Sequence, residues 1–265
     1  MTLGILTHSF NESLLLQKWV DHHSKIADSG IVIDHGTTDD SIKDLRLPDN
    51  WEVIKSNMVD FQCHRLDQEV LEIEQYAKAV YKQDWTVTLC TTEFIFTPDF
   101  KNTIEQVHQQ VPDARALGMR SVCLVDPVEN NSMNLLDHSW GYVDYENDAK
   151  GNRVEGCRRW RFIHNTDNPV YEVGRHGVGV PYVQVPELLL LYCQLAPYPL
   201  CRDRKLAVQT RIPQWDKDHK YGFQHLITEE GLTELHSSQS ALSFDLNTFP
   251  LYKQYAEWWK ANGGL

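Results

Sequence analysis

The sequence predicts an α/β fold in which a doubly wound, mostly parallel sheet is covered by helices on both faces. Apolar, β-branched runs alternate with helix-forming segments along the first part of the chain, which is typical of parallel strands joined by crossover helices. The chain has 265 residues, of which 42% are hydrophobic, so it can bury a sizeable core. These observations favour a folded α/β protein over a disordered or fibrous chain.

The expected sheet begins with four strands, at residues 3–7, 31–33, 51–54 and 85–89. Helix-forming residues lie between them, at residues 14–23, 42–45 and 67–82. In a doubly wound sheet, ligands bind beyond the carboxyl ends of the strands, where the strand order reverses. The predicted ligand site therefore lies in the loops after the first, second and fourth strands, at residues 7–11, 34–40 and 90–94.

The pattern changes in the second part of the chain. Strand-like runs lie at residues 120–125, 160–163 and 170–173, a buried strand or helix at residues 186–193, and an amphipathic helix at residues 252–259. No internal repeat and no Pro- or Ser-rich linker separates this part from the first. We therefore expect a single domain over residues 1–265.

Composition excludes several classes of function. Lys and Arg total 25 against 37 Asp and Glu, a formal net charge of −12, which disfavours a nucleic-acid partner because such binding needs clustered cations. No apolar run reaches the length of about 18 residues that a membrane span needs. The N-terminus lacks the features of a signal peptide. The six cysteines show no metal-binding spacing, so we expect a cytoplasmic protein with reduced thiols.

The strongest candidate for a binding site is the strand that ends in Asp34, with the polar loop after it. The loop side chains that bear oxygen atoms are Thr37, Thr38, Asp39, Asp40 and Ser41. A carboxylate at a strand end accepts hydrogen bonds from a base or from ribose hydroxyls, and loop hydroxyls and amides suit a pyrophosphate. An ordinary turn that leads into a capped helix explains the same residues, and the local pattern leaves both interpretations open.

Two segments resemble family-2-like glycosyltransferases of the GT-A fold. The family's W-x-x-H-H-like helix, its apolar strand ending in Asp and its G-S-T-D loop are matched by Trp19, His22, His23, Asp34, Gly36, Thr37, Thr38 and Asp39. Its W-x-x-x-x-D-x-D-E-F segment is matched by Trp85, Glu93 and Phe94. The resemblance implies a GT-A-like domain whose residues 1–110 bind a nucleotide sugar and whose residues 111–265 form an acceptor half. The implied donor contacts are Thr7, Asn11, Asp34, Thr38 and Asp39.

The resemblance also implies an activity. We expect transfer of a hexosyl or pentosyl group from a nucleoside-diphosphate sugar, UDP-linked by preference, to a hydroxyl of a glycan or another acceptor, with inversion favoured. The main alternative is a non-catalytic protein that binds a sugar nucleotide or glycan on the same fold. A nucleotidylyltransferase is disfavoured because no Gly-rich, Arg-containing loop follows residues 3–7. Transfer to DNA bases is disfavoured by the acidic balance.

One departure from the family concerns the metal. The two aspartates of the D-x-D motif are replaced by Cys90 and Thr92, which cannot supply the hard carboxylate oxygens that Mg²⁺ or Mn²⁺ prefers. Three explanations remain: a metal-independent transferase, a rebuilt metal site or a lineage without activity. We expect weak dependence on Mn²⁺ or Mg²⁺, with Glu93 and His176 as the candidate metal ligands.

Without a tightly bound metal, cationic side chains must neutralise the diphosphate. Arg204 and Lys205 are the preferred candidates, and the basic run at residues 158–161 is the alternative. An inverting transferase also needs a base within reach of the acceptor hydroxyl. The candidates for that base are Glu93, Asp216 and His225, and the sequence does not choose among them.

Overall fold

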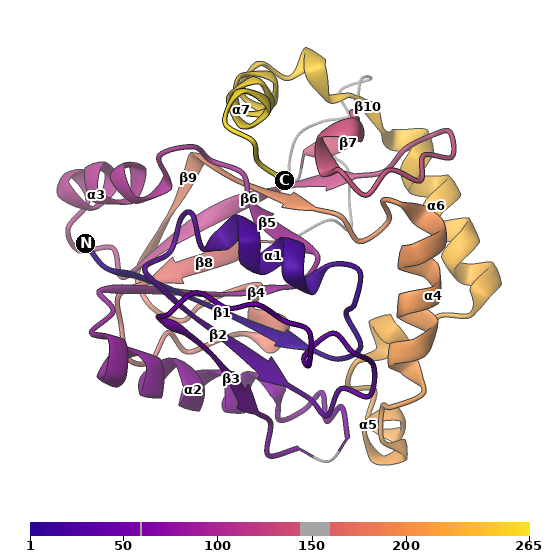
Figure 1. Cartoon of the computed structure of the whole chain (residues 1–265), viewed down its shortest axis with the longest axis horizontal. Helices are drawn as coiled ribbons and strands as arrows, with labels where there is room; N and C mark the ends of the chain where they lie inside the picture. The colour runs from indigo at the N-terminus through magenta and orange to yellow at the C-terminus, as the bar shows by residue number, and fades with distance from the viewer. Residues whose placement is uncertain (59, 144–159) are drawn as a thin grey trace. The chain divides into compact units, whose positions relative to one another are not determined.

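Figure 1 shows the computed structural model, which describes residues 1–58, 60–143 and 160–265. The chain forms two compact units. The first combines Met1–Val59, Arg65–Arg120 and Trp160–Leu190, and the second combines Asp60–His64, Ser121–Arg159 and Leu191–Leu265. The first unit therefore takes segments from both sides of residue 110, where we expected the two halves to meet. The single-domain organisation stays a prediction.

A mostly parallel sheet forms the centre of the first unit. Its parallel strands are ordered β3 (Trp51–Lys55), β2 (Ser29–Asp34), β1 (Leu3–Ser9) and β4 (Trp85–Cys90). Beyond β4 come β8 (Arg161–His164), antiparallel to β4, and β6 (Ala116–Leu124), antiparallel to β8. The short β5 (Glu93–Ile95) pairs with β9 (Tyr182–Tyr192). The predicted α/β class with a mostly parallel sheet is confirmed.

Helices cover both faces of this sheet, as a doubly wound fold requires. In Figure 1, α1 (Leu16–His23) and α3 (Phe100–Gln110) lie on one side and α2 (Leu66–Tyr81) on the other. The face under α2 is filled by aliphatic side chains of β1, β2 and the helix: Leu6, Ile31, Ile33, Val70 and Ala77. Burial of each large aliphatic side chain contributes about 1.5–3 kcal/mol, so this cluster fixes α2 against the strands.

The W-x-x-H-H positions attach α1 to β5. Trp19 is fully buried, and its indole N–H donates to the carbonyl of Glu93 at 2.9 Å. His22 Nε2 lies 2.7 Å from the carbonyl oxygen of Ile95, and the Ile95 N–H donates to His23 Nε2 at 3.2 Å. These residues therefore position the backbone that carries Glu93, and they lie in the core of the unit.

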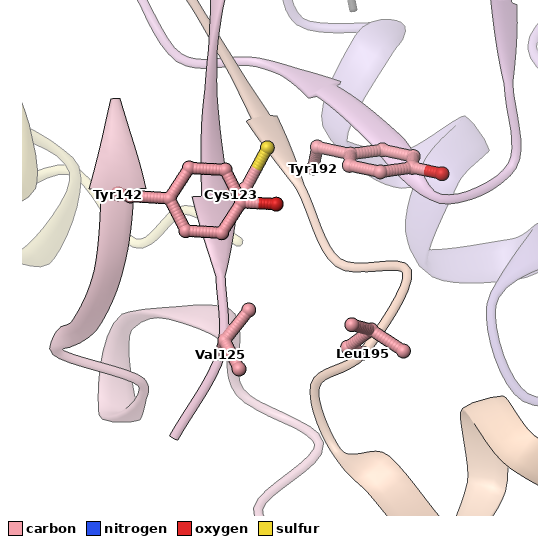
Figure 2. Packing of buried hydrophobic residues seen from close by; sticks show 5 residues of the cluster. All are labelled: Cys123, Val125, Tyr142, Tyr192 and Leu195. Carbon is pink, nitrogen blue, oxygen red and sulfur yellow. The ribbon is translucent and has the colours of Figure 1, made fainter. Parts of the chain in front are cut away.

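The second unit is built from a small antiparallel sheet and helices. β7 (Trp140–Val143) pairs with the end of β6 and with β10 (Phe244–Asp245). Its helices are α4 (Tyr198–Gln209), α5 (Gln214–Asp218), α6 (Glu229–Leu242) and α7 (Pro250–Ala261). Figure 2 shows the buried cluster of this unit: Cys123, Val125, Tyr142, Tyr192 and Leu195. None of the helices in the described part of the chain has the length and apolar character needed to cross a bilayer.

Three expected elements differ in the structure. β1 extends to Ser9, so Thr7 lies within the strand and not at its end. No helix forms at residues 42–45, of which 42–44 lie in a turn, because so short a segment does not repay the cost of helix nucleation. Residues 170–173 are not a strand: Val170 has a left-handed φ of 53°, and Tyr171 makes only an isolated bridge to Val178. A left-handed residue breaks an extended run.

Candidate functional site

The candidate site in the first unit lies at the carboxyl edge of the parallel strands. The register places His8 of β1 beside Cys90 of β4, and Ser9 beside Asp34 of β2. Because these strands run parallel and adjacent, the side chains that follow them gather at one edge of the sheet. The strand order therefore brings the loops after β1, β2 and β4 to one edge, and a ligand site there stays a prediction.

The loops after β1 and β2 are joined by the side chain of Asn11. Asn11 adopts a left-handed φ of 50°, a conformation that Asn tolerates better than most residues. Its Oδ1 accepts from the N–H groups of Thr38 at 2.8 Å and Asp39 at 3.3 Å. Asp34 Oδ1 accepts from the N–H of Thr37 at 2.8 Å. Four of the predicted nucleotide contacts, Asn11, Asp34, Thr38 and Asp39, are thus brought together.

Thr7, the fifth nucleotide contact predicted in this part of the chain, is placed differently. Its side chain is fully buried inside β1, and its hydroxyl lies 3.5 Å from the carbonyl oxygen of His8. Alternation along a strand sends successive side chains to opposite faces, so Thr7 contributes to the core packing of the sheet. A contact between Thr7 and a nucleotide is not supported by this position.

Glu93 is buried and bound to an arginine. It is 1% exposed, and Arg161 Nε lies 3.0 and 2.8 Å from its two carboxylate oxygens. The Cys90 N–H also donates to Glu93, at 2.7 Å. Burial acts to raise the pKa of Glu93, but the positive Arg161 guanidinium and these hydrogen bonds outweigh it and hold the pKa below its usual value. This carboxylate is therefore an ion-pair partner and is poorly placed to take a proton from an acceptor.

The guanidinium of Arg161 connects the segment that contains Cys90 and Glu93 to the Gly-rich segment at residues 174–181. Its Nη1 donates to the Gly174 carbonyl at 2.7 Å and lies 3.1 Å from His176 Nδ1. Its Nη2 donates to Cys90 Sγ at 3.5 Å. The first residue of β8 thus fixes residues that are far apart in the sequence, and His176 lies at the same edge as Cys90.

A second buried arginine lies behind His8. Arg175 is 3% exposed and has a left-handed φ of 60°, a conformation that costs a non-glycine residue about 1 kcal/mol or more. Its Nη1 donates to Asp67 at 2.6 Å, and its Nη2 lies 3.3 Å from His8 Nε2. Its Nε is buried and has no hydrogen-bond partner in the described structure. The Arg175 guanidinium therefore contacts both Asp67 and His8.

The side chains at this edge do not fit a divalent cation. Both oxygens of Glu93 accept from Arg161, and the same guanidinium faces His176 Nδ1. Cys90 and Thr92 supply no carboxylate. Among the described residues, no three His, Cys, Asp or Glu side chains are grouped so as to hold a metal ion. A second cation beside Arg161 would be repelled, so Glu93 and His176 do not form the metal site that we considered.

The remaining predicted residues belong to the second unit. Asp216 is fully buried; its Oδ1 accepts from His64 Nδ1 at 2.5 Å and its Oδ2 from the Cys63 N–H at 2.7 Å. The His64 side chain is 29% exposed and packs against the exposed ring of Trp215, with centroids 4.5 Å apart. Asp216 therefore orients a partly exposed imidazole, and His64 is the member of this pair that solvent can reach.

His225 is partly exposed in a short 3-10 turn, and its ring contacts Phe61 with centroids 5.8 Å apart. Arg204 and Lys205 lie on α4, and Lys205 is buried. Of the alternative basic run, Arg158 and Arg159 lie outside the described residues, whereas Arg161 occupies the sheet edge of the first unit.

The sequence pattern did not identify His8, His64 and Asp67, and it did not show that Arg175 contacts Asp67 and His8. Histidine within an apolar strand and an arginine between glycines were the available signals. Neither signal predicts which residues meet in the fold, because the partners are far apart in the sequence. His8 and Arg175 are separated by 167 positions, and His64 and Asp216 by 152 positions.

No protein-family model matches this chain, and no curated protein matches it. One similar solved structure is that of residues 1–349 of S. aureus TarS, which is 8% identical in sequence and has a TM-score of 0.39. The match covers 78% of this chain and 66% of that chain. Glucosyl-3-phosphoglycerate synthase of Mycobacterium tuberculosis, in complex with Mn²⁺, UDP and glucosyl-3-phosphoglycerate, has 16% identity over 46% of this chain and 44% of that chain, with a TM-score of 0.26.

A third similar structure is 4-diphosphocytidyl-2C-methyl-D-erythritol synthase of Anaerococcus prevotii, with 12% identity over 69% of this chain and 88% of that chain and a TM-score of 0.35. The three TM-scores lie below 0.5. We therefore base the function on the residues of this chain.

Proposed function

We propose that the protein is a glycosyltransferase that moves a sugar from a nucleoside-diphosphate sugar to an acceptor hydroxyl. The observation that carries the proposal is the surface made by Asn11, Asp34 and the loop at Thr37–Asp39, at the carboxyl edge of a mostly parallel sheet. Such an edge is where doubly wound folds bind nucleotides. The resemblance of the two motif segments to family-2-like glycosyltransferases points to the same donor class.

Each group on this surface has a chemical role in the proposal. The partly exposed Asp34 carboxylate accepts hydrogen bonds from a base N–H or from ribose hydroxyls. The exposed Thr38 and the neighbouring Asn11 supply further polar contacts to the nucleoside. We expect UDP as the donor nucleotide, because the resemblance of the two motif segments to family-2-like glycosyltransferases implies it. The net charge of −12 argues against an extended polyanion as the ligand.

The proposed reaction is a single in-line displacement with inversion at the sugar carbon. The acceptor hydroxyl loses its proton to a base, its oxygen bonds to the anomeric carbon, and the bond to the diphosphate breaks. Asp216 and His225 stay candidates for the base, and Asp216 binds the partly exposed imidazole of His64. Glu93 is engaged by Arg161. Arg204 and Lys205 remain candidates for additional contacts to the diphosphate.

The binding step is tested by calorimetry with UDP-, GDP- and CMP-sugars in EDTA. We expect one class to bind the wild-type protein and Asp34→Ala to weaken it at least tenfold. Asp44→Ala, which changes a carboxylate in the turn after the loop, is the matched control and should bind as the wild type does. Absence of binding by every nucleotide sugar would contradict the proposal.

The catalytic step separates the enzyme from a non-catalytic binding protein. Slow hydrolysis of the donor, or transfer to added glycans, should be detected by release of the nucleoside diphosphate, and it should disappear in Asp34→Ala. Tight binding without any release, over a panel of donors and acceptors, would favour the non-catalytic alternative, for which the buried, ion-paired state of Glu93 is the supporting observation.

A further inference from the structure

A cavity of about 370 Å³ lies within the second unit. Its walls come from the segment after β6, from the start of α4 and from α6, and they include Asp126, Tyr198, Arg202 and His236. Pockets that bind small molecules have volumes of roughly 300–1,000 Å³, so this cavity has room for one small ligand. Its lining contains none of the nucleotide-binding or catalytic candidates discussed above.

One wall of the cavity is aromatic and apolar. The rings of Tyr198 and His236 stack with their centroids 4.0 Å apart and their planes at 28°. The Tyr198 hydroxyl donates to Thr233 Oγ1 on α6 at 3.1 Å. The Tyr198 side chain also packs against the buried cluster of Figure 2, and Leu195 of that cluster lines the cavity as well. Contacts with α6 and with this cluster therefore fix the Tyr198 ring in the wall.

Two charged groups of the lining are each bound by neighbouring side chains. Arg202 donates through Nε to Asp203 Oδ1 at 2.8 Å, and its Nη1 lies 3.4 Å from Glu229. Asp126 is 9% exposed and is hydrogen-bonded to the buried His138. Burial acts to lower the pKa of His138, but the hydrogen bond to Asp126 outweighs it and raises the pKa. Neither Arg202 nor Asp126 therefore needs a ligand of opposite charge to neutralise it.

The mixture of polar groups suits a neutral ligand with hydroxyl groups. The carboxylates of Asp126 and Glu129 oppose an anionic ligand, and the Arg202 guanidinium opposes a cationic one. Burial lowers the pKa of His236, although Asp126 opposes this, so the ring is largely uncharged near pH 7. His236 makes no hydrogen bond to another described residue. A hydroxyl group both donates and accepts, so it can pair with either tautomer of this ring and with a carboxylate.

We propose that this cavity binds a neutral saccharide, with a C–H face of the sugar ring against Tyr198 and hydroxyl groups toward Asp126 and His236. A sugar ring combines an apolar face with hydroxyl groups, which matches an aromatic wall beside a few polar side chains. The inference goes beyond the proposed function, because it assigns a ligand to the second unit and requires no nucleotide at Asp34.

The test is saturation-transfer NMR of the full-length protein with glucose, galactose, N-acetylglucosamine and cellobiose, followed by calorimetric titration of each sugar that binds. We expect Tyr198→Ala and His236→Ala each to weaken binding about tenfold or more, which corresponds to about 1.4 kcal/mol. Tyr198→Phe, which keeps the ring, should retain most of the affinity. His219→Ala is the matched control, because His219 also stacks on an aromatic ring, that of Trp215, and does not line the cavity. Thermal melting verifies that each variant folds.

Three outcomes would overturn the inference. The first is that none of the four sugars binds the wild-type protein. The second is equal binding by the wild type, Tyr198→Ala and His236→Ala, which would place the sugar elsewhere. The third is binding of choline in place of the sugars, lost in Tyr198→Ala, which would show a cation site. Titration with nucleotide sugars in the Asp34→Ala variant is a separate measurement, so the proposed function can fail while the saccharide site stands, and the reverse.

Discussion

Arg161 donates through Nε to both carboxylate oxygens of Glu93, at 3.0 and 2.8 Å, with both side chains almost completely buried. Glu93 is the carboxylate of the motif segment, and Arg161 opens a strand that follows it by 68 residues. Glu93 therefore has a structural role. Its ion pair with Arg161 holds β5, β8 and the Gly-rich segment together within the first unit.

Glu93→Gln should destabilise the protein by about 3 kcal/mol, because removing one partner leaves a buried charge uncompensated. Urea unfolding measures this as a shift in the free energy of unfolding. Arg161→Met should have a similar effect, and the double variant should lose less than the sum of the two. Asp40→Asn, which breaks the exposed pair with Lys43, is the control and should have a small effect. Unchanged stability with lost turnover in Glu93→Gln would return Glu93 to the role of base.

Removal of divalent metals should change neither nucleotide affinity nor turnover by much. Arg161 is hydrogen-bonded to the carboxylate of Glu93, and its positive charge disfavours a metal cation at the neighbouring His176. The measurement compares both quantities in EDTA and after addition of Mn²⁺ or Mg²⁺. Complete loss of activity in EDTA that added Mn²⁺ restores would show that other ligands rebuild a metal site.

His64→Gln should lower kcat about 100-fold or more if His64 takes the acceptor proton, with little change in KM for the donor. Asp216→Asn should lower kcat as well, because it removes the carboxylate that orients the imidazole. His219→Gln serves as the control, since His219 stacks on the same Trp215 ring, 4.1 Å away. An unaltered kcat in His64→Gln would exclude this base.

Acid should destabilise the fold through His22. Burial lowers the pKa of His22 from 6.5 to about 4, although the hydrogen bond to Ile95 opposes this. Between these two values the unfolded chain binds a proton that the native state does not, so stability is present above pH 6.5 and is lost as pH falls toward 4. The loss is about 3 kcal/mol. Urea unfolding at several pH values measures it, and His22→Gln should flatten the dependence, whereas an unchanged slope would contradict this origin.

Local pattern was sufficient for the four parallel strands β1, β2, β3 and β4 and for the helices α1, α2 and α7. β-branched runs such as Ile31–Ile33, and helix formers spaced to bury one face, specify these elements within a few residues. Short elements were missed. β5 has only three residues, so its own sequence carries too little signal to predict a strand. Its hydrogen-bond partners Trp19, His22 and His23 lie 72 to 74 positions away in the sequence.

The sequence by itself determined the α/β class, the sheet edge at which Asp34 lies and the loss of the D-x-D carboxylates, because each depends on neighbouring residues. Only the tertiary structure decided what the charged groups do. Whether a carboxylate such as Glu93 is a base, a metal ligand or an ion-pair partner depends on its burial and on the cation that faces it, and β8 supplies that cation from far along the chain. Electrostatic roles of this kind are set by distance in space, which spacing in the sequence does not encode.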